Sequence, residues 1–327
     1  MSVVVDGGSL LVDGKEFVVK GFVYSPYLIG QCPGKLFPSR KVVDLDFKLI
    51  RISKGNTIRI FSDLAKNTPK HVYELAEKYK LKIIQGIDIL KDDFELSDKV
   101  FLTKYKKRIT NIANRLKDSK SLLMWCVGNE ICDDGDERKL GLLKKLIQHL
   151  RKLDDHPITY SNFGTFNHPF YPDEELDVIS AALYIWGLWN DDAKGAYKYN
   201  LEMFLNRAKN KPILITEVGA STTQVAGWLG KGHGGCSEVE QAEFLMDRWS
   251  VIREYLPTNY FTGRVFQKND INFCIGACVF EWSDEHWKNY IGEYGRYSDV
   301  ERHFGIVKSN RKPKKAYYAL RKMWDQL

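Results

Sequence analysis

The sequence alternates between short apolar segments and amphipathic helical segments along its length, and this order limits the possible folds more than any other feature. Eight apolar segments recur at intervals of roughly 30 residues, the repeat length of a βα unit in a (β/α)8 barrel. Strands that alternate with helices favour a parallel sheet covered on its outer face. No G-x-G-x-x-G fingerprint follows the first segment, which argues against an open doubly wound sheet. The expected strands are residues 18–24, 57–60, 81–87, 122–127, 158–160, 178–184, 212–216 and 274–282.

A hairpin signal precedes the first of these strands. Asp13-Gly14 is a strong turn pair, and the apolar runs 10–12 and 17–19 flank it. Such a hairpin could close one end of a barrel. The sequence contains no low-complexity segment and no linker, so we expect residues 1–327 to form a single catalytic (β/α)8 TIM barrel with an N-terminal β-hairpin.

The composition is that of a globular protein with an ample core, with 44% hydrophobic and 28% charged residues. No apolar run is long enough to span a bilayer, so we expect no membrane association. The first residues lack the pattern of a signal peptide, which favours a cytoplasmic protein, with a secreted mature form as the alternative. None of the six cysteines belongs to a C-x-x-C pair, and reduced thiols fit a reducing compartment.

The net charge of +7 is concentrated in two basic runs, residues 104–108 and 311–315. Such runs are usually solvated helix faces. The alternative is attraction to an anionic polymer, such as a polysaccharide that contains uronic acids. The runs lack the interleaved aromatic residues of single-strand binding surfaces, so we expect no nucleic-acid partner. The oligomeric state stays open.

Two glutamates directly follow buried strands. The first strand ends in Gly128-Asn129-Glu130, and the second ends in Thr216-Glu217. A carboxylate at the tip of an apolar strand is costly unless it is paired or functional. Glu130 and Glu217 lie 87 positions apart, which corresponds to three βα units of 29 residues. We therefore expect both at the face where barrel enzymes keep their sites, although either one alone could be a structural partner of Arg59.

Two carboxyl groups across a barrel mouth suit the cleavage of a glycosidic bond with retention of configuration. This reaction needs carboxyl groups about 5–5.5 Å apart, one as proton donor and one as nucleophile. The repulsion between them helps to raise the pKa of the donor. Neither a metal nor an organic cofactor is required.

The chain resembles clan A of the glycoside hydrolases over nearly its whole length, because Asn129-Glu130 follows the fourth strand and Glu217 follows the seventh. Residues 127–130 and 216–219 are also similar to the β-1,3-glucanases and fungal glucanosyltransferases of this clan. No β-sandwich region precedes the barrel, which sets the expected substrates apart from the exo substrates of the β-galactosidases. Segments that resemble the β-galactosidase and β-glucuronidase family are residues 13–21, 56–59, 304–307 and 311–318.

The resemblance implies roles for residues at the strand ends. Glu130 would be the acid/base and Glu217 the nucleophile. Arg59 would keep the nucleophile ionised by its charge and hydrogen bonds. Asn129 would bind the 2-hydroxyl of the sugar, a contact that strengthens in the transition state.

Aromatic residues complete the expected site. The resemblance implies that Tyr184 donates its hydroxyl to the nucleophile, with Trp186 as the rival for that inward position. Trp186, on a loop at the same face, is also a candidate substrate-binding residue on which a sugar ring could stack. It also implies that Trp282 offers a flat face to a sugar ring, although large aromatics are often simply buried. Glu281 precedes Trp282 and should point the opposite way, in a structural role. The polar and aromatic loop 283–288 could line a sugar subsite or form a network at the rim.

The leading hypothesis is a retaining β-glycoside hydrolase that cleaves a β-linked, glucan-like oligo- or polysaccharide internally. A transglycosylase is the alternative, since the same two glutamates would serve and an acceptor sugar would replace water. A sugar-binding barrel without catalysis is a third interpretation, and the intact pair of glutamates counts against it.

Overall fold

Eight parallel strands close into a barrel in the computed structural model, in the order β10-β11-β4-β5-β6-β7-β8-β9. The expected fold class is therefore confirmed. The structure describes residues 1–33, 37–60, 68–132, 134–163, 174–184, 192–208, 210–223, 237–257, 273–288 and 301–327. The barrel strands are β4 (Val19–Tyr24), β5 (Thr57–Ile60), β6 (Lys82–Ile87), β7 (Leu122–Asn129), β8 (Ile158–Phe163), β9 (Val178–Ala182), β10 (Ile213–Val218) and β11 (Cys274–Val279).

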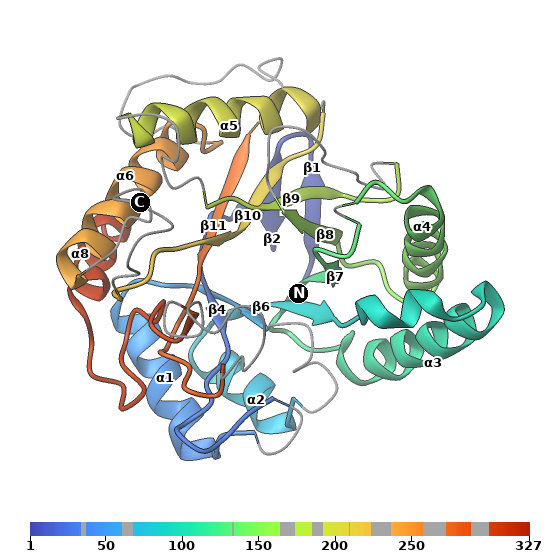
Figure 1. Ribbon diagram of the computed structural model, residues 1–327, viewed down its shortest axis with the longest axis horizontal. Coiled ribbons are helices and arrows are strands. Elements are labelled where there is room, and N and C mark those ends of the chain that lie inside the picture. The colour runs from blue at the N-terminus through green and yellow to red at the C-terminus, as the bar shows by residue number, and fades with distance from the viewer. Residues whose placement is uncertain are drawn as a thin grey trace.

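Helices surround the barrel on its outer face, as Figure 1 shows. Their buried residues follow the helical period: in α1, Val43, Phe47 and Ile50 face the barrel and belong to the main core. The helices are α1 (Arg40–Ile52), α2 (Lys70–Lys78), α3 (Asp98–Leu116), α4 (Glu137–Arg151), α5 (Ala193–Ala208), α6 (Glu238–Glu254) and α8 (Lys315–Trp324), with a 3-10 turn η2 (Lys91–Glu95). None of the described helices is long and apolar enough to cross a membrane.

The N-terminal sheet differs from the expected hairpin. It contains β1 (Val3–Asp6), β2 (Ser9–Val12) and β3 (Lys15–Glu16), all antiparallel. The expected second arm, residues 17–19, is wrong, because β3 ends at Glu16 and Val19 already begins the first barrel strand. The turn at Asp13-Gly14 is where the sequence placed it, with both residues at positive φ.

This sheet closes the floor of the barrel. Leu10 of β2 is fully buried in an apolar cluster with inward-facing barrel residues such as Ile84, Leu123 and Ile275. Val12 packs against the same cluster. The amino ends of the strands are thus sealed, which leaves the opposite end for a site.

Helix starts follow the local capping chemistry. The Ser237 side chain accepts a hydrogen bond from the Glu240 backbone amide and donates one to the Glu240 carboxylate, as the S-x-x-E pattern at this position favours. Asp136 caps α4 by accepting from the amides of Arg138 and Lys139.

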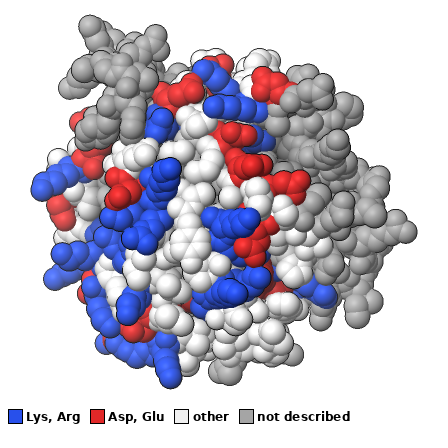
Figure 2. Space-filling view, turned by 90° about the vertical axis from the view of Figure 1, so that its left-hand side faces the viewer, with Lys and Arg blue, Asp and Glu red and all other residues white. Residues whose placement is uncertain are grey.

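The surface charges are mixed on the side of the molecule that carries α1, α6 and α8. Figure 2 shows Lys and Arg side chains there interspersed with Asp and Glu. Exposed ion pairs join several of them, such as Lys54 with Asp325 at 2.6 Å. In the run 311–315, however, Arg311 and Lys314 are buried and pair with Asp46 and Asp284, so the expectation that this run is a solvated helix face is wrong.

Candidate active site

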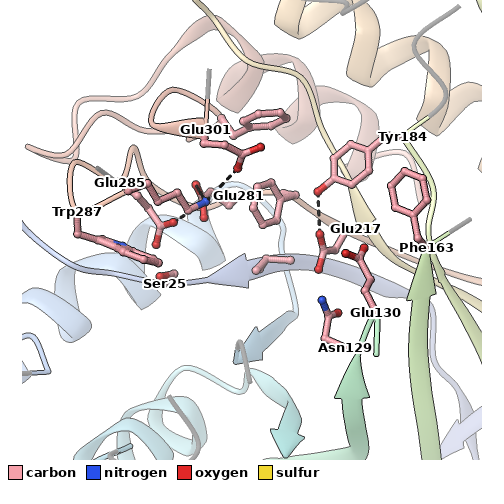
Figure 3. Close-up of a pocket in the computed structure, with 14 residues that line it drawn as sticks. Ser25, Asn129, Glu130, Phe163, Tyr184, Glu217, Glu281, Glu285, Trp287 and Glu301 are labelled. Atoms are coloured by element: carbon pink, nitrogen blue, oxygen red, sulfur yellow. Dashed lines mark hydrogen bonds and ion pairs between the residues drawn. The ribbon is translucent and has the colours of Figure 1, made fainter. Parts of the chain in front are cut away.

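A cavity of about 430 Å³ lies where the barrel strands end, on the side opposite the N-terminal sheet. Its volume is within the usual range for small-molecule sites. Figure 3 shows the side chains that point into it. The cavity is lined by Val23, Ser25, Asn129, Glu130, Phe163, Tyr184, Glu217, Phe280, Glu281, Glu285, Trp287, Lys288, Glu301 and Phe304.

Glu217 is held by hydrogen bonds to both carboxylate oxygens. Arg59 of β5 donates to Oε1 at 2.5 Å, and the Tyr184 hydroxyl donates to Oε2 at 2.7 Å. Glu217 is 4% exposed and Arg59 is 2% exposed, so this ion pair lies away from water. Charge-assisted bonds of this kind stabilise the ionised carboxylate. The contacts are those that the sequence predicts for a nucleophile.

The pKa values of the two partners follow from this contact. Burial would lower the pKa of Arg59, but the Glu217 carboxylate outweighs it, so the pKa is raised and the guanidinium stays charged. Burial and the same carboxylate raise the pKa of Tyr184 well above its ordinary value. The Glu301 and Glu130 carboxylates also raise the pKa of Tyr184. The phenol therefore remains a hydrogen-bond donor at neutral pH.

A bulge at the end of β7 presents Asn129 and Glu130 to the cavity. Gly128 has a φ of 81° and Glu130 a φ of 50°, and the pairing of β7 with β8 changes register here. The positive φ at position 128 favours glycine, and a side chain there would also meet Cδ1 of Ile131 at 2.7 Å. The Glu130 amide donates to the Ser161 carbonyl at 2.9 Å, which fixes the bulge.

Arg59 connects the two strand ends. Besides Glu217, it donates to Oδ1 of Asn129 at 2.6 Å. The Asn129 amide nitrogen is thereby oriented, because its carbonyl oxygen faces the guanidinium. Hydrogen bonds therefore connect four residues that the sequence singles out, Arg59, Asn129, Tyr184 and Glu217, and Glu130 lines the cavity beside them.

Strand β11 ends earlier than expected, and this changes which residues face the cavity. The strand ends at Val279, not at Trp282. Phe280 and Glu281 line the cavity, whereas Trp282 is fully buried and packs edge-on against Phe22 at 5.1 Å. The expected stacking position of Trp282 is thus wrong, and so is the expectation that Glu281 points away from the site. Strict alternation of side chains does not continue once the chain leaves the strand.

The wall beyond Phe280 is acidic. Lys288 Nζ lies 2.7 Å from Oε2 of Glu285, 3.3 Å from Oε1 of Glu281 and 3.6 Å from Oε2 of Glu301. Burial, and then the charge of Glu285, raise the pKa of Glu281 well above its ordinary value. Figure 3 shows these carboxylates on the side of the cavity away from Tyr184 and Glu217. Glu285, Trp287 and Lys288 of loop 283–288 line the cavity. Of the two interpretations of this loop, the position of these residues favours a sugar subsite.

Several lining residues were not expected from the sequence. Phe163 carries no motif, Phe304 belongs to a family-like segment to which the sequence assigns no site role, and Glu301 does not directly follow an expected strand. The polar and aromatic residues of loop 283–288 are the sequence feature from which this wall could be predicted. The expected contact of Trp186 lies outside the described residues.

Paired glutamates at the carboxyl ends of strands β7 and β10, in a closed eight-stranded barrel, are the arrangement of clan A of the glycoside hydrolases. The family model described as glycosyl hydrolases family 2, TIM barrel domain, matches residues 3–327. The chain therefore belongs to this family of retaining glycoside hydrolases, which confirms the expected enzyme class and the resemblance to clan A. A comparison with curated proteins found no match.

Solved structures share the fold. A β-glucuronidase from Ruminococcus gnavus has a TM-score of 0.79 and 17% identity, covering 100% of this chain and 53% of its own. A β-galacturonidase from Eisenbergiella tayi bound to galacturonate has a TM-score of 0.75 and 19% identity, covering 99% of this chain and 54% of its own. A Bifidobacterium dentium β-glucuronidase complexed with coumarin-3-O-glucuronide has a TM-score of 0.76 and 20% identity, covering 99% and 49%. The chain thus spans about half the length of these structures.

Proposed function

We propose that this protein is a retaining β-glycoside hydrolase in which Glu217 is the nucleophile and Glu130 the acid/base. The observation that carries the assignment is the pair of hydrogen bonds to Glu217, one from Arg59 and one from Tyr184. They hold one carboxylate in place as an acceptor of two hydrogen bonds, while Glu130 lines the same cavity from the end of β7.

The reaction would proceed in two displacements. In the first, Glu217 attacks the anomeric carbon, the glycosidic C–O bond breaks, and Glu130 gives its proton to the departing oxygen. The product is a glycosyl ester of Glu217. In the second, Glu130 takes a proton from water, and the water oxygen displaces Glu217 from the anomeric carbon with net retention. When Glu217 becomes an ester its negative charge is lost, so the repulsion that favours the protonated form of a neighbouring carboxyl group falls and Glu130 can act as a base.

The proposed substrate is a β-linked, glucan-like oligo- or polysaccharide that is cleaved internally. The substrate contacts proposed for the site are Asn129, through its oriented amide, and the aromatic lining residues. Five described cysteines are free thiols, which supports our proposal of a cytoplasmic location. Products of a defined oligosaccharide would separate internal from terminal cleavage, and products longer than the substrate would indicate transfer to an acceptor sugar.

Two substitutions test the roles with an activated aryl β-glycoside. Glu217→Gln should abolish turnover, because the amide cannot form the glycosyl ester. Glu130→Ala should slow turnover by about 10²–10⁴-fold, the usual contribution of a general acid/base. Azide should restore the rate of Glu130→Ala, since it attacks the glycosyl-enzyme without a base, and the product should be the β-glycosyl azide.

The matched control is Glu243→Gln on the exposed face of α6, which removes one glutamate charge away from the cavity. It should keep the wild-type rate. Wild-type rates in Glu217→Gln or Glu130→Ala, or a product of inverted configuration by proton NMR, would contradict the proposed roles.

A further inference from the structure

The acidic wall of the cavity, formed by Glu281, Glu285 and Glu301 around Lys288, is not used by the two displacements. Glu281 and Glu285 have side chains that are each 1% exposed, and that of Glu301 is 46% exposed. Burying carboxylates against the walls of a cavity is costly unless they are paired or bind a ligand. The presence of three carboxylates beside the cavity therefore indicates a role other than the two displacements.

Lys288 is already neutralised within this wall. Its ammonium contacts all three carboxylates, and its side chain is 10% exposed. The phenyl ring of Phe280 covers it, with Nζ 4.6 Å from the ring centroid. The ammonium thus has no positive charge to spare for an incoming anion. Even with Glu281 protonated, the wall carries more negative than positive charge.

The other cation near the cavity is engaged in the same way. Arg59 binds Glu217 and Asn129, as described above. Among the residues that the structure describes, Lys288 is the one Lys, Arg or His side chain in the cavity lining. A carboxylate on the substrate would therefore meet like charge along this wall.

Two buried polar atoms of the cavity lining, in Glu285 and Trp287, indicate that a ligand binds here. Oε1 of Glu285 is buried and accepts from no amide, ammonium or alcohol donor among the described residues; the partners of this carboxyl group within the wall are Lys288 and the side chain of Glu281. The indole nitrogen of Trp287, another lining residue, is also buried without an acceptor in the described part of the chain. Buried polar groups are nearly always hydrogen-bonded in the functional state. A sugar hydroxyl can both donate to Glu285 and accept from Trp287.

We propose that this wall is the specificity-determining subsite, which binds the hydroxyl groups of an uncharged pyranose and excludes uronic acids. The proposal rests on the proposed glycosidase function. It separates this chain from the uronic-acid-binding structures that share its fold, and it argues against an anionic polysaccharide as the substrate despite the net charge of +7. Among the described residues, the Lys and Arg side chains other than Lys288 lie outside this cavity lining.

Paired substrates test the proposal directly. The 4-nitrophenyl β-D-glucoside is compared with the β-D-glucuronide, and the β-D-galactoside with the β-D-galacturonide, so that each pair differs only in the oxidation of C6. We expect the better neutral glycoside to exceed its uronide at least about 100-fold in kcat/KM, because unpaired like charge in a desolvated site is strongly unfavourable. A uronide that is turned over as well as or better than its neutral counterpart overturns the proposal.

Variants tie the discrimination to the wall. Glu301→Gln and Glu285→Gln each remove one negative charge, and each should lower the neutral-to-uronide ratio of kcat/KM about 10-fold, the equivalent of one weakened charge contact. Glu243→Gln on α6 is the matched control and should leave the ratio unchanged. An equal ratio in all three variants would show that the wall does not set the specificity.

Covalent labelling separates this proposal from the proposed function. Glucose-configured and glucuronate-configured cyclophellitol epoxides each esterify a retaining nucleophile, and intact mass and peptide mapping report the adduct on Glu217. An adduct with the glucose-configured reagent and none with the uronate supports both proposals. An adduct with the uronate alone overturns the specificity and keeps the function, whereas no adduct with either reagent counts against the function and the specificity together.

Discussion

The hydroxyl group of Tyr184 should make a measurable contribution to catalysis. It donates to Oε2 of Glu217 at 2.7 Å, while its ring packs edge-on against Phe280 and Phe304. Tyr184→Phe keeps the ring contacts and removes the bond to a charged acceptor, worth about 1.5–3 kcal/mol. We expect kcat/KM to fall about 10–100-fold with little change in melting temperature.

The control for this change is Tyr197→Phe. The Tyr197 hydroxyl is buried without a hydrogen-bond partner in the described structure, and the residue lies outside the cavity. Its loss should leave kcat/KM unchanged. Steady-state kinetics and thermal unfolding of both variants decide the matter: an active Tyr184→Phe enzyme with wild-type kcat/KM would remove the hydroxyl from the mechanism.

The predicted site residues that the structure brings together share one property. Arg59, Asn129, Glu130 and Glu217 lie within or directly after apolar strands, and parallel strands of a barrel bring such positions to one mouth. Glu301 follows no strand, and its place in the cavity depends on how the chain returns after residue 288. Hydrophobic periodicity does not predict where a residue outside the strands and helices lies in space.

At the scale of elements, the strand interiors follow from the sequence and the strand ends do not. The residues of β5 match the expected segment, because a short run of buried residues is typical of a strand that is covered on both faces of the sheet. The end of β11 was placed three residues too late, and this reversed the assignments of Glu281 and Trp282. An apolar pattern continues through Phe280 and Trp282, although Trp282 lies beyond the strand and packs edge-on against Phe22.

The N-terminal sheet gives a prediction at the same scale. Leu10→Ala should lower the free energy of unfolding by about 2–5 kcal/mol, since the sheet cannot fill the space left at the barrel floor. The rate of the folded enzyme should be unchanged, because the site lies at the other end of the strands. Val4→Ala on β1, a residue 50% exposed, is the control and should stay within about 0.5 kcal/mol. Urea unfolding and kcat measure both, and equal stabilities of the two variants would contradict the sealing role.

At the scale of the whole molecule, the last part of the chain holds the first part in place where the barrel closes. Strand β11 pairs with β4, the first barrel strand, and the chain beyond β11 returns over this seam. Arg311 donates to both carboxylate oxygens of Asp46 in α1, at 2.9 and 3.0 Å, across 265 positions of sequence. The Tyr317 hydroxyl donates to the Leu49 carbonyl at 2.8 Å. Closure of the barrel and docking of α8 on α1 therefore depend on one another.

Removal of Arg311 should weaken the whole fold rather than one helix. The side chains of Arg311 and Asp46 are 4% and 0% exposed, so Arg311→Met leaves a buried carboxylate with Tyr24 as its remaining donor. Loss of one partner of a buried pair costs about 3–5 kcal/mol, and we expect this decrease in a single cooperative urea transition. Arg40→Met is the matched control, because its partner Glu74 is 42% exposed, and exposed pairs contribute about 0–1 kcal/mol. If the two variants lose equal stability, or if Arg311→Met unfolds in two separate steps, the seam does not couple the ends of the chain.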